Sequence, residues 1–359
     1  MTSRALDRTS AGNPIGSMLI RLLIPLLIAG CASPQLQEAS GRSGRPRLGI
    51  ESAIMADGYR LPLRHWGGTE RPKAQVLALH GFNDYGNAFA SLGPYLAARG
   101  ILTYAYDQRG FGATAQRGRW SGEERMIADL GVLTDLLRER HPDAPLFLLG
   151  ESMGGAVVMA ATAASKKVDG IILVAPAVWS RDSMSPIQRL ALAVAARTLP
   201  WLELTGEGME IRPSDNLDML REFSADPLVI KSTRIDTLWG VANIMDLAMA
   251  EADELSGPIL LLYGEHDRII PQNAFCAFVD RVPGERQGIR IVLYQNGWHM
   301  LTRDLQGERV MADIAGWIED QEARLPSGEE IEAGSHRLER FCTGRWTRIT
   351  NLSRSADQF

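Results

Sequence analysis

The chain alternates short apolar runs with longer stretches of helical periodicity, and this alternation restricts its fold more than any other feature. A run that is apolar at nearly every position is typical of a strand buried on both faces. Six such runs are predicted strands, at residues 75–79, 101–106, 146–149, 171–174, 259–263 and 289–294. Helices are predicted between them, at 89–99, 123–140, 156–164, 273–281 and 308–324. This order predicts a mostly parallel central sheet flanked by helices, the α/β class.

The alternation begins after a predicted antiparallel hairpin, Leu48–Trp66, with its turn at Asp57-Gly58. It stops between Pro176 and Glu254, where the chain is helix-like and rich in Leu, Ala, Met and Trp. We predict that residues 177–254 form a helical lid inserted into a single domain, 48–325. Its most apolar part, Ile187–Leu202, fits either a helix packed on the core or an acyl-chain channel or membrane-facing surface.

The N-terminus is predicted to be a targeting segment. Residues 15–30 are almost wholly apolar and follow Arg4 and Arg8. The uninterrupted apolar core, Leu22–Ala29, is far shorter than the roughly 20 residues of a membrane-spanning helix. A basic start, a short apolar stretch and then small residues are typical of a secretory signal.

The end of that signal, Ile28-Ala-Gly-Cys31, resembles the lipobox of bacterial lipoproteins. The resemblance implies that residues 1–30 are a lipoprotein signal peptide and that Cys31 becomes the lipidated first residue. An ordinary cleaved signal and an uncleaved anchor are the alternatives. Residue 32 is Ala rather than Asp, which in that family favours the outer membrane. We therefore expect a lipid-anchored protein of the bacterial cell envelope, on the periplasmic side, with residues 31–47 as a polar tether.

The C-terminal residues 326–359 mix Glu and Arg with few apolar side chains and are predicted to be a polar, peripheral tail. After processing at Cys31, the remaining cysteines are Cys276 and Cys342. The sequence leaves open whether they form a disulfide or stay as two separate thiols, because it does not give their distance. No C-x-x-C pair is present, which argues against zinc, and a net charge of −5 argues against a nucleic-acid partner.

The segment Gly150-Glu-Ser152-Met-Gly-Gly155 lies between a predicted strand and a predicted helix. A G-x-S-x-G motif in this context is typical of a nucleophile elbow, whose tight turn exposes the serine hydroxyl at the edge of the sheet. We therefore predict that Ser152 is a nucleophile. The simpler interpretation, a glycine-rich turn without chemistry, does not explain why the motif stands between a strand and a helix.

A serine hydroxyl attacks a carbonyl only when a base removes its proton, so a histidine is required. The chain has six histidines. Five are poorly placed: His65 in the leading hairpin, His80 at a strand end in another loop, His141 at a helix end, His266 beside a better-placed acid and His336 in the tail. His299, just after the last predicted strand, is the predicted base.

The acid that orients this histidine is expected between the serine and the histidine in chain order. The segment Tyr263-Gly-Glu265-His-Asp267 follows an apolar strand. Asp267 is preferred over Glu265 because the chain continues from it through a turn into the next helix. Asp226 is the alternative, with a lid turn or a helix cap as its plainer role.

The first central strand ends in His80-Gly81-Phe82, where an oxyanion donor is expected. We predict that the main-chain N–H groups of Phe82 and Met153 bind the developing oxyanion, each stabilising the transition state by about 2.7–4 kcal/mol. The turn Asp107–Gly112 lacks the Lys-Ser/Thr ending of a P-loop and is predicted to shape the chain rather than to bind phosphate.

Four segments together resemble the α/β-hydrolase superfamily, and within it the monoacylglycerol lipase and lysophospholipase branch. They are the elbow Gly-Glu-Ser-Met-Gly-Gly, the Asp107-Gln-Arg-Gly-Phe-Gly turn, the Gly-Glu-His-Asp267 loop and His299-Met-Leu. The resemblance spans roughly Ile50–Leu325. It implies an α/β-hydrolase fold with a helical lid, the triad of Ser152, Asp267 and His299, oxyanion donors at Phe82 and Met153, and no metal or organic cofactor. The loop after His80-Gly matches the branch only in part, which affects the expected substrate range.

The expected function is hydrolysis of carboxylic esters through an acyl-enzyme on Ser152, with monoacylglycerols or lysophospholipid-type single-chain lipids as substrates. The alternative within the fold is a short-chain esterase or an aminopeptidase-like hydrolase. Carboxylates in the insertion, such as Glu203, Glu207 and Glu210, keep the peptidase open because they suit an N-terminal amine. A non-catalytic envelope scaffold is a third hypothesis, which the complete set of triad residues disfavours.

Overall fold

The fold is described from a computed structural model of the chain. It describes residues 33–38, 43–68, 70–161, 166–206, 211–255, 257–282, 288–332 and 334–343. The predicted signal peptide 1–30, Cys31 and the end of the predicted tail lie outside the described residues. No helix within the described ranges is long and apolar enough to cross a membrane.

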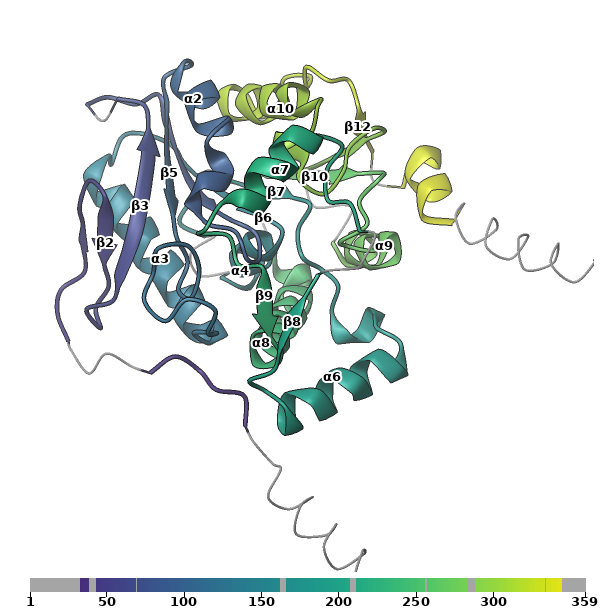
Figure 1. The fold of residues 1–359 in the computed structure, drawn as a ribbon. Coiled ribbons are helices and arrows are strands. Elements are labelled where there is room, and N and C mark those ends of the chain that lie inside the picture. The colour runs from purple at the N-terminus through teal and green to yellow at the C-terminus, as the bar shows by residue number, and fades with distance from the viewer. Residues whose placement is uncertain are drawn as a thin grey trace, which may run out of the picture.

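A single large sheet organises the described chain (Figure 1). Its strands follow the order β1-β2-β3-β5-β4-β6-β7-β10-β11-β12. Their bounds are Arg47–Leu48, Ser52–Ile54, Arg60–Trp66, Ile101–Tyr106, Ala74–Leu79, Leu146–Glu151, Gly170–Val174, Ile259–Gly264, Ile289–Tyr294 and Glu330–Ile331. Neighbours from β5 through β11 are parallel, while the strands at both ends of the sheet join antiparallel. The six predicted parallel strands and the leading hairpin are thereby confirmed.

The central strands lie between two apolar layers. Every residue of β4 is buried, and alternate side chains point to opposite faces. Leu77 and Leu79 belong to one core cluster, and Val76 and Ala78 belong to the other. A strand apolar on both faces can sit only between two layers of helices, which is why the continuous apolar runs were informative.

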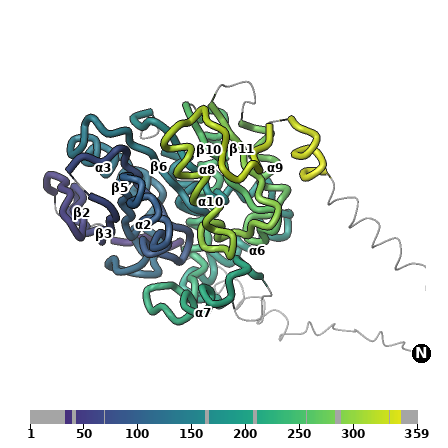
Figure 2. Tube along the Cα trace, turned by 90° about the horizontal axis from the view of Figure 1, so that it is seen from above, coloured from purple at the N-terminus to yellow at the C-terminus, as the bar shows by residue number. Residues whose placement is uncertain are grey.

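Two sets of helices supply those layers (Figure 2). The first cluster holds side chains of α3 (Glu123–Arg140), α4 (Met153–Ala160), α8 (Ile235–Ala250) and α9 (Gln272–Arg281). The second holds side chains of η1 (Gly86–Phe89), α2 (Leu92–Ala97) and α10 (Gly307–Glu319). With helices on both faces, a site is expected at the carboxyl ends of the strands, the usual location in open α/β sheets.

The insertion at 177–254 differs from the prediction because it is not wholly helical. Its described elements are η2 (Arg181–Ser183), α6 (Pro186–Thr198), β8 (Glu203–Thr205), α7 (Leu217–Ala225), β9 (Ser232–Arg234), α8 and η3 (Ala252–Glu254). Strands β8 and β9 pair antiparallel as a small separate sheet. Helix α8 is part of the core, with Ile244 and Ala248 fully buried. The end of the insertion therefore belongs to the body.

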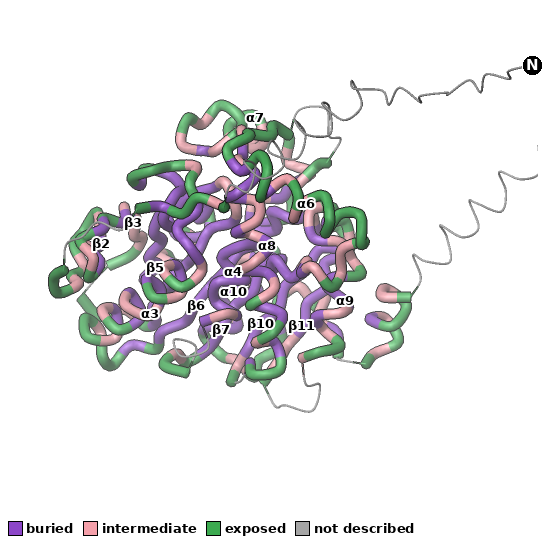
Figure 3. Tube along the Cα trace, turned by 90° about the horizontal axis from the view of Figure 1, so that it is seen from below, coloured by how far each residue is buried: buried purple, intermediate pink, exposed green. Residues whose placement is uncertain are grey.

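Helix α6 is exposed, as Figure 3 shows. Ile187 and Leu190 are 81% and 66% exposed, and Ala196 is the buried residue of this helix. Exposed apolar side chains continue beyond it, and together they define what we call the α6 apolar surface: Ile187, Leu190, Val194, Leu199, Trp201 and Leu202. The exposure of these side chains excludes one of the two interpretations of Ile187–Leu202, a helix packed fully on the core.

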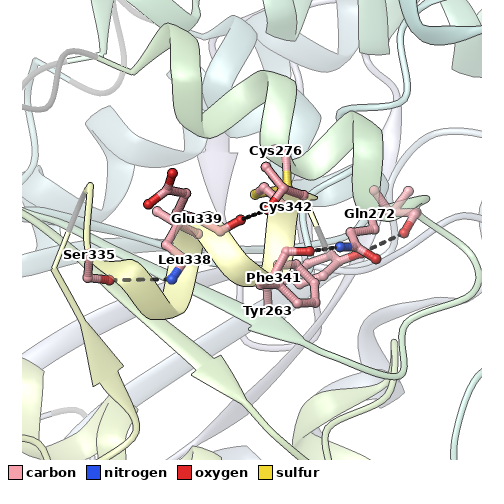
Figure 4. The surroundings of a disulfide bond; sticks show 10 residues. Tyr263, Gln272, Cys276, Ser335, Leu338, Glu339, Phe341 and Cys342 are labelled. Atoms are coloured by element: carbon pink, nitrogen blue, oxygen red, sulfur yellow. Dashed lines mark hydrogen bonds between the residues drawn. A yellow bond between two sulfur atoms is a disulfide. The ribbon is translucent and has the colours of Figure 1, made fainter. Parts of the chain in front are cut away.

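The C-terminal segment is more firmly attached than a polar tail would be. Strand β12 pairs antiparallel with β11, with Ile331 opposite Ile291, and residues 336–343 are helical. Cys276 of α9 and Cys342 form a disulfide (Figure 4). Next to it, the ring of Phe341 lies edge-on to Tyr263, with centroids 6.1 Å apart. Of the two alternatives for these cysteines, the structure has the disulfide.

Candidate active site

Ser152 stands at the sharp turn between β6 and α4. Its backbone lies at φ 52° and ψ −117°, a conformation that a non-glycine residue adopts only under strain. Glycines make the turn sterically feasible. A Cβ on Gly150 would come within 2.5 Å of the Gly155 main chain, and one on Gly154 would meet the Leu79 carbonyl oxygen at 2.2 Å. The local geometry is that of the predicted nucleophile elbow.

The structure brings together the three side chains predicted from sequence. His299 Nε2 lies 3.0 Å from Ser152 Oγ, and His299 Nδ1 lies 2.8 Å from Asp267 Oδ2. A carboxylate can only accept, so Nδ1 carries the proton and Nε2 is the acceptor for the serine hydroxyl. The three residues follow β6, β10 and β11, so parallel strands bring them to the same edge of the sheet.

Asp267 is itself held in place. Its Oδ1 accepts the main-chain N–H groups of Ile269 and Ile270, at 2.8 and 3.0 Å. The other oxygen is thereby left for His299. Burial acts to lower the pKa of His299, but the charge of Asp267 and the hydrogen bond to it outweigh burial and raise the pKa above its usual value. A base with a raised pKa accepts the serine proton more readily.

The loop after β4 runs directly against the nucleophile. A Cβ on Gly81 would lie 3.3 Å from Ser152 Cβ, so a side chain at this position would crowd the serine. This close approach brings the main chain of residues 81–82 to the side of Ser152. Met153 directly follows the serine and begins α4. Both predicted oxyanion donors are therefore next to Ser152, one in space and one in sequence.

His80 fixes the direction of the first donor. Its Nε2 accepts the Gln108 N–H at 3.0 Å, so its Nδ1–H donates to the Gly81 carbonyl at 2.8 Å. That carbonyl and the Phe82 N–H belong to one planar peptide unit. Burial lowers the pKa of His80, which keeps the imidazole neutral. The Asp107–Gly112 turn thus supports the oxyanion loop, in keeping with its predicted shaping role.

The alternative acids lie elsewhere. Asp226, at the end of α7, accepts a hydrogen bond of 2.6 Å from the Tyr85 hydroxyl and caps a turn through the Leu228 N–H. Glu265 faces Arg337 of the C-terminal segment, at 3.4 Å. Neither is joined to His299, so the structure favours Asp267.

Sequence reasoning missed two residues just beyond His299. Asp304 accepts the Trp298 N–H at 2.7 Å and the Ser214 hydroxyl at 2.6 Å, and burial raises its pKa to about 7. Arg303 extends to the strand ends that carry the oxyanion loop and the elbow. The local sequence marks them only as adjacent opposite charges shortly after His299-Met-Leu, and this does not show what they contact.

No group of three or more His, Cys, Asp or Glu side chains suited to a metal ion occurs in the described part of the chain. The chemistry available at the site is that of an activated hydroxyl, a base that can return the proton, and main-chain donors for an oxyanion. This combination on a parallel sheet defines a serine hydrolase of the α/β-hydrolase class.

Comparison with known proteins places the chain more narrowly. Residues 70–306 match the family described as serine aminopeptidase, S33, and the chain belongs to that family. The monoacylglycerol lipase of Mycolicibacterium smegmatis is 26% identical over 274 residues, covering 73% of this chain and 93% of that protein. The human monoglyceride lipase is 25% identical over 291 residues, covering 77% and 93%. The protein is accordingly a carboxylic ester hydrolase.

The fold has a close counterpart among solved structures. A soluble variant of the Saccharomyces cerevisiae monoglyceride lipase, in complex with a substrate analogue, superposes with a TM-score of 0.63. It is 19% identical, and the match covers 81% of this chain and all of that one. The expected fold class, an α/β-hydrolase sheet flanked by helices, is confirmed.

Proposed function

We propose that the protein hydrolyses single-chain lipid esters, monoacylglycerols or lysophospholipids, through an acyl-enzyme on Ser152. The observation that carries this proposal is the continuous chain of hydrogen bonds from Ser152 Oγ through His299 to Asp267. Relatives named for monoacylglycerol hydrolysis, aligned over most of their length, support the substrate class.

In the proposed reaction, Ser152 Oγ attacks the ester carbonyl while His299 Nε2 takes the hydroxyl proton. The carbonyl oxygen becomes an oxyanion between the Phe82 and Met153 N–H groups, and Asp267 stabilises the imidazolium. His299 then gives its proton to the leaving alcohol as the C–O bond breaks. Water attacks the resulting acyl-enzyme, again losing a proton to His299, and the return of that proton to Ser152 releases the carboxylic acid.

We further propose that the protein works at a lipid surface of the bacterial envelope, and that the part of the 177–254 insertion that precedes α8 is the lid. The support for this is the lipobox-like Ile28–Cys31, the α6 apolar surface and the disulfide. Disulfides persist mainly in oxidising compartments, and the periplasm is one of them. Contiguous exposed apolar side chains are typical of surfaces that meet a membrane or a partner. An anchor at Cys31 and the α6 apolar surface would together keep the enzyme at its substrate.

Aminopeptidase activity is the second candidate, favoured by the family's description. Such an enzyme needs carboxylates that hold an N-terminal amine. Of the three acids named above, Glu203 is exposed on β8 and accepts a hydrogen bond from Ser232, and Glu207 and Glu210 lie outside the described residues. The single-chain lipid ester is the better-supported substrate.

A fluorophosphonate probe tests the enzyme class, with S152A as the matched control. Labelling of the wild type and not of S152A is expected. Kinetics on p-nitrophenyl esters of increasing chain length, beside amino-acid p-nitroanilides, then test the substrate. Octanoate or longer esters should be preferred; a preference for acetate or for anilides would refute the lipid proposal. C31S should abolish incorporation of a labelled lipid precursor, and continued labelling would refute the anchor.

A further inference from the structure

Arg303 makes two buried ion pairs beside the reaction site. It ends η4 (Leu301–Arg303), the turn that begins two residues after His299. Its Nη1 lies 2.8 Å from Asp84 Oδ2, and its Nη2 lies 2.6 Å from Glu151 Oε1. The side chains of Arg303, Asp84 and Glu151 are only 10%, 5% and 3% exposed. One guanidinium and two carboxylates are thus packed together out of water.

Each of these residues belongs to a different part of the proposed reaction site. Asp84 is two residues after Phe82, in the loop that supplies the first oxyanion donor. Glu151 directly precedes Ser152 and the second donor, Met153. Arg303 itself is four residues after His299. The guanidinium therefore joins the loop after β4, the last residue of β6 and the turn after β11. These are the segments that carry the oxyanion donors, the nucleophile and the base.

We propose that Arg303 is the positioning residue of this site, which sets the spacing between the two oxyanion donors and holds the His299 turn against both. The proposal rests on the proposed ester hydrolysis and adds a residue to it. Arg303 contacts Asp84 and Glu151 and not the reacting atoms. It therefore acts on the placement of the oxyanion donors and of His299.

The geometry of the guanidinium suits this task. Its N–H groups form a rigid planar fork, so the positions of Asp84 and Glu151 are fixed relative to each other as well as to Arg303. An oxyanion hole requires donors within 2.7–3.1 Å of the oxyanion, and misplacement by about 1 Å costs about 10²-fold in rate. A lysine has a single ammonium group on a flexible stem and cannot impose the same spacing.

Stability alone is a poor explanation for such a cluster. Buried ion pairs recover little more than the cost of removing their charges from water, and apolar replacements are often as stable. The cluster also pairs two carboxylates with one guanidinium, so negative charge is in excess near His299. The charged groups acting on His299 are Asp267 and Glu151, which raise its pKa, and Arg303, which lowers it. Loss of the guanidinium therefore has an electrostatic consequence that a merely structural residue would not produce.

The experiment compares R303M and R303K with the wild type, using p-nitrophenyl octanoate kinetics from pH 5 to pH 9. R303M should lower kcat by about 10²-fold with KM changed less than threefold. It should also move the acidic limb of kcat/KM to higher pH, because His299 loses a neighbouring cation. R303K restores a positive charge, so it should return the acidic limb of the kcat/KM profile to its wild-type position. It does not restore the spacing of the oxyanion donors, so kcat should stay low.

R290M is the matched control. Arg290 also binds a carboxylate through two nitrogens, with Nε 2.6 Å from Glu330 Oε1, but it lies near the amino end of β11, away from the site. Its loss should reduce stability and leave kcat and the pH profile unchanged. Urea denaturation of all variants separates misfolding from misplacement, and R303K remains informative if R303M does not fold.

The proposal is overturned if R303M is folded and keeps wild-type kcat and acidic limb, or if R303K restores kcat fully. An effect of R290M equal to that of R303M would also overturn it. Failure of the proposed function shows differently: the wild type would then not hydrolyse the ester, or S152A would hydrolyse it equally well. The fluorophosphonate labelling rate of R303M, expected to fall in parallel with kcat, gives a readout independent of the ester chosen.

Discussion

Removal of the Cys276–Cys342 disulfide is expected to destabilise the protein without reducing its activity. The bridge closes a loop with a sequence separation of 66 residues. In the chain-entropy account, a crosslink over that length stabilises the fold by about 4 kcal/mol at 25 °C, because it restricts the unfolded chain. The double variant C276S/C342S should lose about this much free energy of unfolding.

The native contacts explain why activity should survive. Phe341 still packs beside Tyr263, the Gln272 side chain still donates to the Phe341 carbonyl, and β12 still pairs with β11. None of these contacts needs the S–S bond. The disulfide stabilises the fold mainly by restricting the unfolded chain, so its removal should leave the native site unchanged. The kcat of the double variant should therefore stay within about twofold of the wild type.

Urea denaturation followed by tryptophan fluorescence measures the effect, in a C31S background so that only two cysteines remain. With an m-value of about 3 kcal/mol/M, the unfolding midpoint should fall by about 1.3 M. A reducing agent should lower the wild-type midpoint by the same amount and leave the double variant unaffected. The predicted role of the disulfide would be refuted if neither the double substitution nor the reducing agent changed the midpoint. Titration of two free thiols in the denatured C31S protein, without reducing agent, would show that the disulfide is absent.

Three other outcomes are expected from single groups at the site. Protonated His299 cannot accept the serine proton, so kcat/KM should fall as the pH drops through a value above 6.5; a profile flat from pH 6 to pH 8 would contradict this. G81A places a Cβ 3.3 Å from Ser152 Cβ and should reduce kcat about 10²-fold, with KM little changed in steady-state kinetics. The pKa of Asp304 is raised from 3.8 to about 7, so its contribution to stability is full below pH 4 and is lost as the pH rises through 7, by up to about 4 kcal/mol. Urea denaturation at pH 5 and pH 8 should show that D304N removes this loss, and an equal pH dependence in wild type and D304N would rule out Asp304 as its source.

The parts of the fold that could be predicted are those with a local signal. Strands such as β4 and β10 are buried at every position, so their composition identifies them without knowledge of their neighbours. The elbow at Ser152 was recognisable because glycine is sterically required there. Strands β8 and β9 have three residues each, and all of β8 is exposed, so they carry neither an apolar run nor a periodicity.

The parts that could not be predicted depend on distant partners. Arg303 meets Glu151 and Asp84 across 152 and 219 residues of chain, and nothing near position 303 specifies either contact. The pairing of Cys276 with Cys342 likewise follows only from how α9 and the C-terminal helical segment pack. The sequence motif identified Ser152, Asp267 and His299 because each follows a recognisable strand, whereas their supporting charges lie in loops without such a marker.

Strand β12 has a consequence for how the chain reaches its native state. It pairs with Ile291 and Val292 in the middle of β11, whose N–H and C=O groups would otherwise be unpaired at this end of the sheet, and exposed strand edges of this kind promote aggregation. It is the last strand of this sheet in chain order, and every other strand of the sheet precedes it. A chain that has folded only as far as β11 therefore carries this edge unpaired. Truncation before β12 should yield a chain that retains every proposed catalytic residue but aggregates.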